Sequence, residues 1–160
     1  MKFRGRISFS GLLILLILGI CLAAPFLSPY DPNAISVADP FSGPSAKHWM
    51  GADDLGRDSL SRILYGGRIT ILIAMAATTI ALLIGTSWGL IAGVRRGWVD
   101  ELLMRTADAT MAIPQILFAL VCVSAVGASV ISLPIVVGIL LSPTTARMAR
   151  SAVVTELASD

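Results

Sequence analysis

Residues 69–94 read I-T-I-L-I-A-M-A-A-T-T-I-A-L-L-I-G-T-S-W-G-L-I-A-G-V, a run of 26 residues without a charged side chain. An α-helix rises about 1.5 Å per residue and the hydrocarbon core of a bilayer is about 30 Å thick, so this run is long enough to cross a membrane once. Two more uncharged runs, at residues 7–30 and 109–146, account for much of the remaining chain. The first of them suits one crossing, and the second suits two short ones.

The longest of these runs contains a signal for a turn. Gly127-Ala128-Ser129, with Pro134 soon after, favours a tight turn near residues 127–132. The sequence therefore predicts an all-α fold, a polytopic membrane helix bundle with four spans at roughly residues 9–28, 69–94, 109–127 and 131–146.

The overall composition agrees with a membrane protein. Hydrophobic residues make up 56% of the 160 residues and charged residues only 14%, and the mean hydropathy is +0.84. Soluble domains average about 45–50% apolar and about 25% charged residues, so the composition argues against a soluble domain. From this composition we expect the lipid bilayer as a partner. A net charge of +2 is too small to indicate a nucleic-acid-binding protein, so we expect no nucleic acid as a partner.

The basic residues predict the orientation, because cytoplasmic loops carry an excess of Lys and Arg. With both ends in the cytoplasm, the inner segments hold eight basic residues and the one outer segment, residues 29–68, holds four. We therefore expect both termini to be cytoplasmic. The inner residues are Lys2, Arg4, Arg6, Arg95, Arg96, Arg105, Arg147 and Arg150, and the outer ones are Lys47, Arg57, Arg62 and Arg68.

The first uncharged run has an alternative interpretation as a cleaved signal peptide, because basic residues precede a stretch rich in Leu and Ile. The sequence Leu18-Gly19-Ile20-Cys21 also resembles a lipoprotein cleavage box, but that box needs a small residue where Ile20 stands. We expect the run to be retained as a signal-anchor helix.

The predicted outer segment divides into two parts. The first contains four prolines among Asp, Asn, Ser and Gly residues, which favours an irregular, extended chain. The apolar residues of the second part share one face of a short amphipathic helix at about residues 58–65, where Asp58 and Arg62 have the favourable spacing for an ion pair. We expect this helix to lie on the outer membrane surface, where it is either a simple interfacial anchor or part of a functional surface, and to lead through Gly66-Gly67 into the span.

Small residues recur at every fourth position of the second span and form a ridge. In lipid, helices associate through close backbone approach, which such ridges permit, so we expect neighbouring helices to pack here. The ridge consists of Ala77, Ala81, Gly85, Gly89 and Gly93.

Few polar side chains fall inside the predicted spans. Gln115 is the one amide, and it follows Pro114, which favours a kink in the third span. Gln115, Thr78 and Ser124 are candidates to line a translocation pathway, but the favoured interpretation of Gln115 is a hydrogen bond to a neighbouring helix.

The residues indicate no catalytic, cofactor-binding or metal-binding site. The sequence has no Gly-x-Ser-x-Gly elbow and no phosphate-binding glycine loop with its lysine. The single histidine, His48, has no second candidate ligand beside it, so we expect an exposed loop residue. Because no ionisable residue lies deep in a span, ion-coupled transport by this chain alone is disfavoured, and energy for transport would come from a partner.

The stretch from Gly51 to Arg68 reads G-A-D-D-L-G-R-D-S-L-S-R-I-L-Y-G-G-R. It closely resembles the signature that follows the first span in dipeptide/oligopeptide/nickel-type ABC transporter permeases, which is usually G-T-D-x-x-G-R-D, then S-R, then G-x-R. The matching positions are Gly51, Asp53, Gly56, Arg57, Asp58, Ser61, Arg62, Gly66 and Arg68.

The resemblance continues along essentially the whole chain from Ile7. Further matches lie at residues 97–101, 103–105 and 112–114, at Asp108, and at residues 146–150 after the predicted fourth span. Two departures are small: Ala52 stands where Thr is usual, and Ser142-Pro143-Thr144-Thr145 replaces a stretch that contains an aromatic residue.

The resemblance implies the N-terminal part of an ABC importer permease domain at residues 1–160, in a multi-pass protein of the bacterial inner membrane. Such permeases import di- or oligopeptides or a related solute such as nickel. They work with a second permease subunit, two cytoplasmic ATPase subunits and a periplasmic solute-binding protein. ATP is bound by the ATPase partners, and the permease binds no cofactor and performs no chemistry.

Members of this family continue through further spans and carry a cytoplasmic E-A-A-x-x-x-G loop that fits a groove of the ATPase. The present sequence reaches Asp160 where that loop should begin. The alternatives are a truncated permease, half of a split permease completed by another chain, or an incomplete reading of a longer protein. A non-transporting membrane protein that assembles with related permeases is the competing function.

Overall fold

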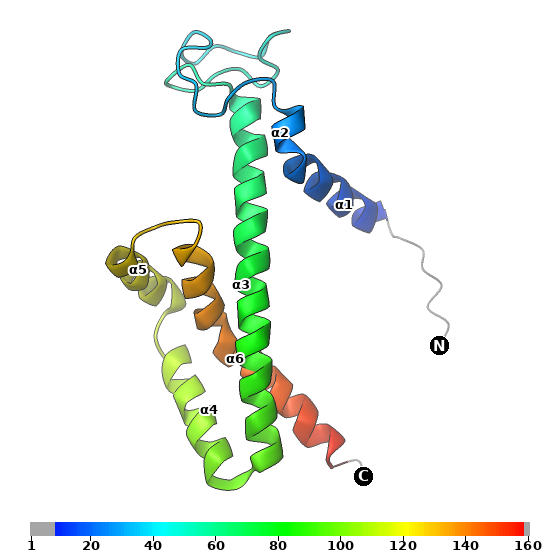
Figure 1. The fold of residues 1–160 in the computed structure, drawn as a ribbon, viewed down its shortest axis with the longest axis vertical. Coiled ribbons are helices and arrows are strands. Elements are labelled where there is room, and N and C mark those ends of the chain that lie inside the picture. Colours follow the sequence, from blue (N-terminus) through cyan, green and yellow to red (C-terminus); the bar gives the residue numbers. More distant parts are fainter. Residues whose placement is uncertain (1–8, 159–160) are drawn as a thin grey trace. The chain divides into compact units, whose positions relative to one another are not determined.

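A computed structural model describes residues 9–158 of the chain and shows an all-helical fold, which confirms the predicted class. Six helices follow one another, and the described residues contain no β-strand, only an isolated bridge between Ala52 and Asp58. The chain forms two compact units, which divide between Ile71 and Leu72. Figure 1 labels the helices. Their bounds are α1 Phe9–Leu22, α2 Ala24–Leu27, α3 Ser59–Arg95, α4 Gly97–Met111, α5 Gln115–Val126 and α6 Ser132–Glu156.

The first unit contains α1, α2, a long irregular segment and the first turns of α3. We call residues 28–58 the connecting loop. The predicted surface helix at 58–65 is not a separate element, because α3 continues through Gly66 and Gly67 without a break. A glycine inside a helix costs about 1 kcal/mol relative to alanine. Gly67 has a packing role, since a Cβ at this position would lie 2.7 Å from the sulfur of Cys21 in α1.

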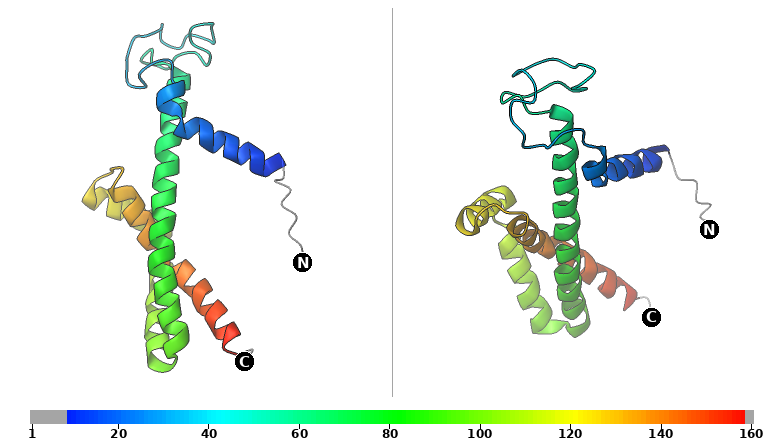
Figure 2. Two further views of the ribbon diagram at one scale, coloured as in Figure 1. Left: turned by 45° about the vertical axis from the view of Figure 1, so that its right-hand side comes forward. Right: turned by 45° about the horizontal axis from the view of Figure 1, so that its top comes forward.

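The second unit contains the rest of α3 and the helices α4, α5 and α6. A turn at Arg96 and Gly97, both with positive φ, reverses the chain so that α4 runs back beside the end of α3 (Figure 1). The views in Figure 2 show α6 crossing α3 within this unit. Here Arg105 of α4 pairs with Glu101 at 2.7 Å, at the i, i+4 spacing that stabilises helices.

The region predicted as the third span bends sharply. The axes of α4 and α5 differ by 84°, and residues 112–114 form the break between them. Pro114 explains the break, since proline has no N–H to donate and disfavours helical geometry in the residue before it. The predicted kink is therefore a complete interruption, and α5 begins at Gln115.

The chain turns between α5 and α6 at residues 127–131, where the Gly127-Ala128-Ser129 sequence predicts a turn. Gly127 ends α5 with a φ of 86°, which glycine adopts without strain. The hydroxyl of Ser129 accepts the N–H of Ser132 at 2.9 Å and so satisfies a free donor at the start of α6. Further along α6, Pro143 is buried, and the hydroxyl of Ser142 donates to the Gly138 carbonyl at 2.8 Å.

By length and composition, two of the described helices can cross a membrane, α3 and α6. The bent pair of α4 and α5 makes a third candidate if it is one span, and α1 is a shorter apolar helix of 14 residues. The four spans and the cytoplasmic termini thus stay predictions. Lys2, Arg4 and Arg6, on which the orientation partly depends, lie outside the described residues.

Candidate functional site

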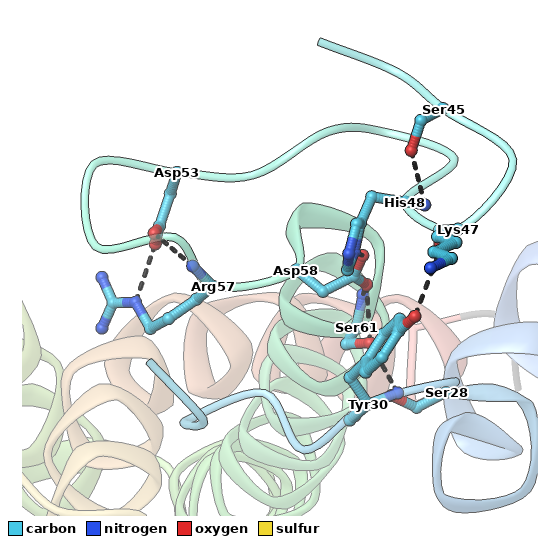
Figure 3. A network of polar contacts seen from close by, with 9 residues as sticks. All are labelled: Ser28, Tyr30, Ser45, Lys47, His48, Asp53, Arg57, Asp58 and Ser61. Carbon is cyan, nitrogen blue, oxygen red and sulfur yellow. Dashed lines mark hydrogen bonds and ion pairs between the residues drawn. The ribbon is translucent and has the colours of Figure 1, made fainter. Parts of the chain in front are cut away.

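Asp58 is at the centre of a buried polar network in the first unit (Figure 3). Its side chain is fully buried immediately before α3. One carboxylate oxygen, Oδ2, accepts the backbone N–H of Ser61 at 2.8 Å and the hydroxyl of Ser61 at 2.7 Å. The backbone bond is a helix N-cap, which satisfies one of the four free N–H groups at the start of α3.

His48 completes the network from the connecting loop. Its Nδ1 lies 3.0 Å from Oδ1 of Asp58, and because a carboxylate can only accept, Nδ1 carries the proton. The imidazole stacks on Tyr30, with ring centroids 4.8 Å apart (Figure 3). The backbone N–H of Tyr30 donates to the Ser61 hydroxyl at 3.3 Å, so the cluster joins three separate segments.

Two expectations from the sequence are corrected here. His48 is only 8% exposed, not an exposed loop residue, because the connecting loop folds its imidazole between Tyr30 and Asp58. Asp58 does not pair with Arg62, because its carboxylate points into the interior and is occupied by Ser61 and His48. Arg62 pairs with Asp53 instead.

The hydrogen bonds of this cluster do not form a Ser-His-Asp triad. A nucleophilic serine needs a base that takes its proton, and in a Ser-His-Asp triad that base is the histidine. Here the Ser61 hydroxyl donates to Asp58 and accepts from Tyr30, and no hydrogen bond connects it to His48 among the described residues. Within the same residues, no three His, Cys, Asp or Glu side chains are grouped to hold a metal ion.

Asp53 organises the second polar group of the connecting loop. It accepts the backbone N–H groups of Leu55 and Arg57 at 2.9 Å each and the Nε of Arg57 at 2.8 Å, and it also pairs with Arg62. Desolvation raises the pKa of Asp53, but these hydrogen bonds and the Arg57 charge hold it well below its ordinary range. The signature positions 53, 57 and 62 therefore form one ionic cluster.

Two signature glycines are required by the backbone. Gly51 and Gly56 have φ angles of 71° and 67°, in the region that other residues rarely adopt. A Cβ at Gly51 would overlap the carbonyl oxygen of Ser42, and one at Gly56 would overlap that of Ala38. Neighbouring segments of the loop approach so closely at these two positions that only glycine fits.

We predict that Gly56→Ala destabilises the connecting loop by about 2 kcal/mol, from the combined cost of strained φ and overlap with backbone. Gly66→Ala is the matched control, because a Cβ there has open space in a helix and should be neutral or slightly stabilising. Limited trypsin cleavage after Lys47 measures the effect. Equal cleavage rates in the two variants would contradict this account.

The other signature residues are placed more loosely. Gly66 is exposed on α3, and Arg68 is half-buried on the same helix. The described residues include no ion-pair partner for Arg68. Most signature residues thus shape the connecting loop or the first turn of α3.

The ridge of small residues on α3 faces α6 in the second unit. Ala77 and Ala81 are almost fully buried. A Cβ at Gly85 would lie 2.6 Å from the Ser142 carbonyl oxygen, and Cβ atoms at Gly89 and Gly93 would likewise collide with α6. Gly138 provides the reciprocal close approach on α6, where an added Cβ would lie 2.7 Å from the side chain of Ile80. Close backbone contact of this kind is how helices associate in lipid.

The three candidate pathway residues lie apart on two helices. Thr78 is exposed on α3, and Gln115 and Ser124 are exposed on α5. Thr78 lines a shallow depression of about 370 Å³ with Thr79, Ala74 and Met75. In the described part of the chain, no hydrogen bond joins the side chains of Thr78, Gln115 and Ser124, so their role stays a prediction.

Two ion pairs between α4 and α6 were not predicted from the sequence. Arg150 donates from Nε and Nη2 to the two carboxylate oxygens of Asp100, each at 2.5 Å, and Arg147 pairs with Asp108. The partners are 50 and 39 residues apart, so no local spacing rule could have found them. They fix the relative position of α4 and α6, since a forked guanidinium–carboxylate contact is directional.

Comparison with known proteins supports the resemblance found in the sequence. Residues 85–160 match the family described as binding-protein-dependent transport system inner membrane component. The chain is 39% identical over 142 residues to the glutathione transport system permease protein of Pectobacterium atrosepticum, a match that covers 88% of this chain and 47% of that protein.

Two further relatives are permeases of peptide systems. The dipeptide transport system permease protein of Alkalihalophilus pseudofirmus is 36% identical over 152 residues, which is 94% of this chain and 50% of that protein. The di/tripeptide transport system permease protein of Pseudomonas aeruginosa is 35% identical over 160 residues, with 96% and 53% covered. These matches confirm the predicted resemblance, and the chain spans about half the length of the relatives it matches.

Proposed function

We propose that this chain, whose residues 85–160 match the family described as binding-protein-dependent transport system inner membrane component, is a permease subunit, or the N-terminal part of one, of an ATP-driven solute importer. The observation that carries the proposal is the similarity over most of the chain to permeases named for glutathione, dipeptide and di/tripeptide transport. Short peptides are the proposed solute class, with a related solute such as nickel as the alternative within the same family.

The proposed partners follow from the way such a permease is energised. The uncharged run at residues 69–94 has no ionisable group to couple an ion gradient to transport. We assign ATP binding and hydrolysis to two cytoplasmic ATPase subunits, solute capture to a periplasmic binding protein, and the other half of the pathway to a second permease subunit. This chain contributes membrane helices and no catalytic group.

In the proposed arrangement the chain spans the bacterial inner membrane four times with both ends in the cytoplasm. The connecting loop then faces the periplasm, and the turn between α3 and α4 faces the cytoplasm. Arg95 and Arg96 at the turn between α3 and α4 support this orientation, because cytoplasmic loops carry an excess of basic residues. The exposed Trp98 beside them suits a membrane–water interface on either side.

Uptake measurements in the bacterium that encodes the chain test the proposal. Deletion of its gene should reduce the uptake of a labelled dipeptide to the level of passive entry, and the wild-type gene should restore it. Uptake of a labelled amino acid is the control for general damage to the membrane. Labelled Ni²⁺ distinguishes the alternative solute. If both dipeptide and Ni²⁺ uptake survive deletion, the proposed solute class is wrong.

A further inference from the structure

A cavity of about 660 Å³ lies within the first unit, between residues 28–33 and the first turns of α3. Its volume is in the range of small-molecule sites, about 300–1,000 Å³. Polar side chains form much of the lining, and five of them matter for the argument: Tyr30, Asp31, Asn33, Arg62 and Tyr65. Arg62 and Gly66 of the signature belong to the lining, and the other lining residues lie outside that motif.

The charges around the cavity do not cancel. Arg62 is neutralised by Asp53, which also binds Arg57, while Arg57 has a second contact with Asp54 at 3.7 Å. Those two arginines and two aspartates balance one another. Asp31, the other charged residue of the lining, has no ion-pair partner among residues 9–158. The lining therefore carries one uncompensated negative charge.

The carboxylate of Asp31 is held in place by one hydrogen bond and can still accept others. Its Oδ1 accepts the backbone N–H of Asn33 at 2.8 Å, and in the described structure no hydrogen bond reaches Oδ2. Pro29 and Pro32 on either side restrict the backbone. The hydroxyl of Ser28 donates to the Tyr30 carbonyl at 2.6 Å. This wall of the cavity is therefore preorganised.

We propose that this cavity binds a primary ammonium group. A carboxylate with a free oxygen attracts a cation, and the Asn33 side-chain oxygen can accept a further N–H. Two sources supply this chemistry: the α-ammonium of a short peptide, or the headgroup of phosphatidylethanolamine. The peptide source rests on the proposed function.

Asp31→Asn is the informative substitution, because the amide oxygen still accepts the Asn33 N–H while the negative charge is lost. Asp39→Asn is its matched control. Asp39 is also exposed in the connecting loop, but it does not line the cavity. Both variants change the net charge equally, so a difference between them reports on the cavity and not on the general electrostatic field.

The experiment measures binding to the full chain in nanodiscs, without partner subunits or ATP. In phosphatidylcholine discs, alanyl-alanine should bind saturably, and N-acetyl-alanyl-alanine should not bind. Asp31→Asn should lower the affinity for alanyl-alanine by about fivefold, which is the scale of a partly exposed ion pair. If the natural occupant is lipid, native mass spectrometry should show phosphatidylethanolamine retained by the wild type and by Asp39→Asn but lost from Asp31→Asn.

Either Asp31-dependent result supports the ammonium site. The proposal is overturned if neither the free peptide nor phosphatidylethanolamine distinguishes Asp31→Asn from Asp39→Asn. Because the binding assay requires no transport, it tests the ammonium site separately from the proposed import function. Asp31-dependent binding without dipeptide uptake would support the ammonium site and contradict the proposed function. Dipeptide uptake without Asp31-dependent binding would support the proposed function and contradict the ammonium site.

Discussion

Replacing Gly89 with leucine is expected to push α3 and α6 apart and to lower the free energy of unfolding of the second unit by about 3 kcal/mol. Even a single Cβ at Gly89 would overlap the Ala146 carbonyl oxygen and lie 2.7 Å from the Cβ of Ala149. The first of these contacts is with backbone, which cannot move aside as a flexible side chain can. The remaining leucine atoms would have to displace α6 as a whole.

Ala76→Leu is the matched control for Gly89→Leu, because Ala76 is exposed on the same helix and can accept a larger side chain. We expect its effect to stay within about 0.5 kcal/mol. Thermal unfolding of both variants in nanodiscs, followed by circular dichroism, measures the difference. If Gly89→Leu unfolds at the same temperature as Ala76→Leu, the ridge of small residues does not hold α3 against α6.

Features that depend on local sequence were predictable. A helix needs only suitable residues along a continuous segment, so the uncharged run at 69–94 predicted the main part of α3. The turn at residues 127–131 follows in the same way from its glycine and serine residues. The spacing of the small residues on α3 indicated which face would be packed. It did not indicate α6 as the partner, since many helices can approach such a face.

Contacts between segments that lie far apart in the chain could not be predicted from the sequence. The i, i+4 rule paired Asp58 with Arg62, but that rule assumes that both side chains lie on a solvated helix surface. Asp58 instead caps α3 from a buried position, and the competing partner of Arg62, Asp53, lies on a loop whose course depends on Gly51 and Gly56. The prediction of an exposed His48 is wrong for the same reason. Its burial depends on the folding of residues that precede it and follow it.

Asp58→Ala is expected to destabilise the first unit by about 3 kcal/mol, because it removes the N-cap of α3 and leaves buried donors on His48 and Ser61 without an acceptor. Asp39→Ala, at an exposed position of the same loop, should change the stability by less than about 0.5 kcal/mol. Trypsin cleavage after Lys47 reports on both variants. Equal protection would mean that Asp58 does not hold the connecting loop.

The same carboxylate makes the stability of the loop depend on pH. Burial raises the pKa of Asp58, but hydrogen bonds from Ser61 and His48 outweigh it, and the pKa lies below its ordinary value. A carboxyl whose pKa is lowered by folding stabilises the folded state above the unfolded pKa of about 4, and this contribution disappears as the pH falls through the folded pKa.

The melting temperature of the wild type should therefore fall in acid. Asp58→Asn cannot titrate, so its melting temperature should change less over the same range. Parallel curves for the two proteins would assign the acid sensitivity to another group, of which Asp53, with its similarly lowered pKa, is the first to test.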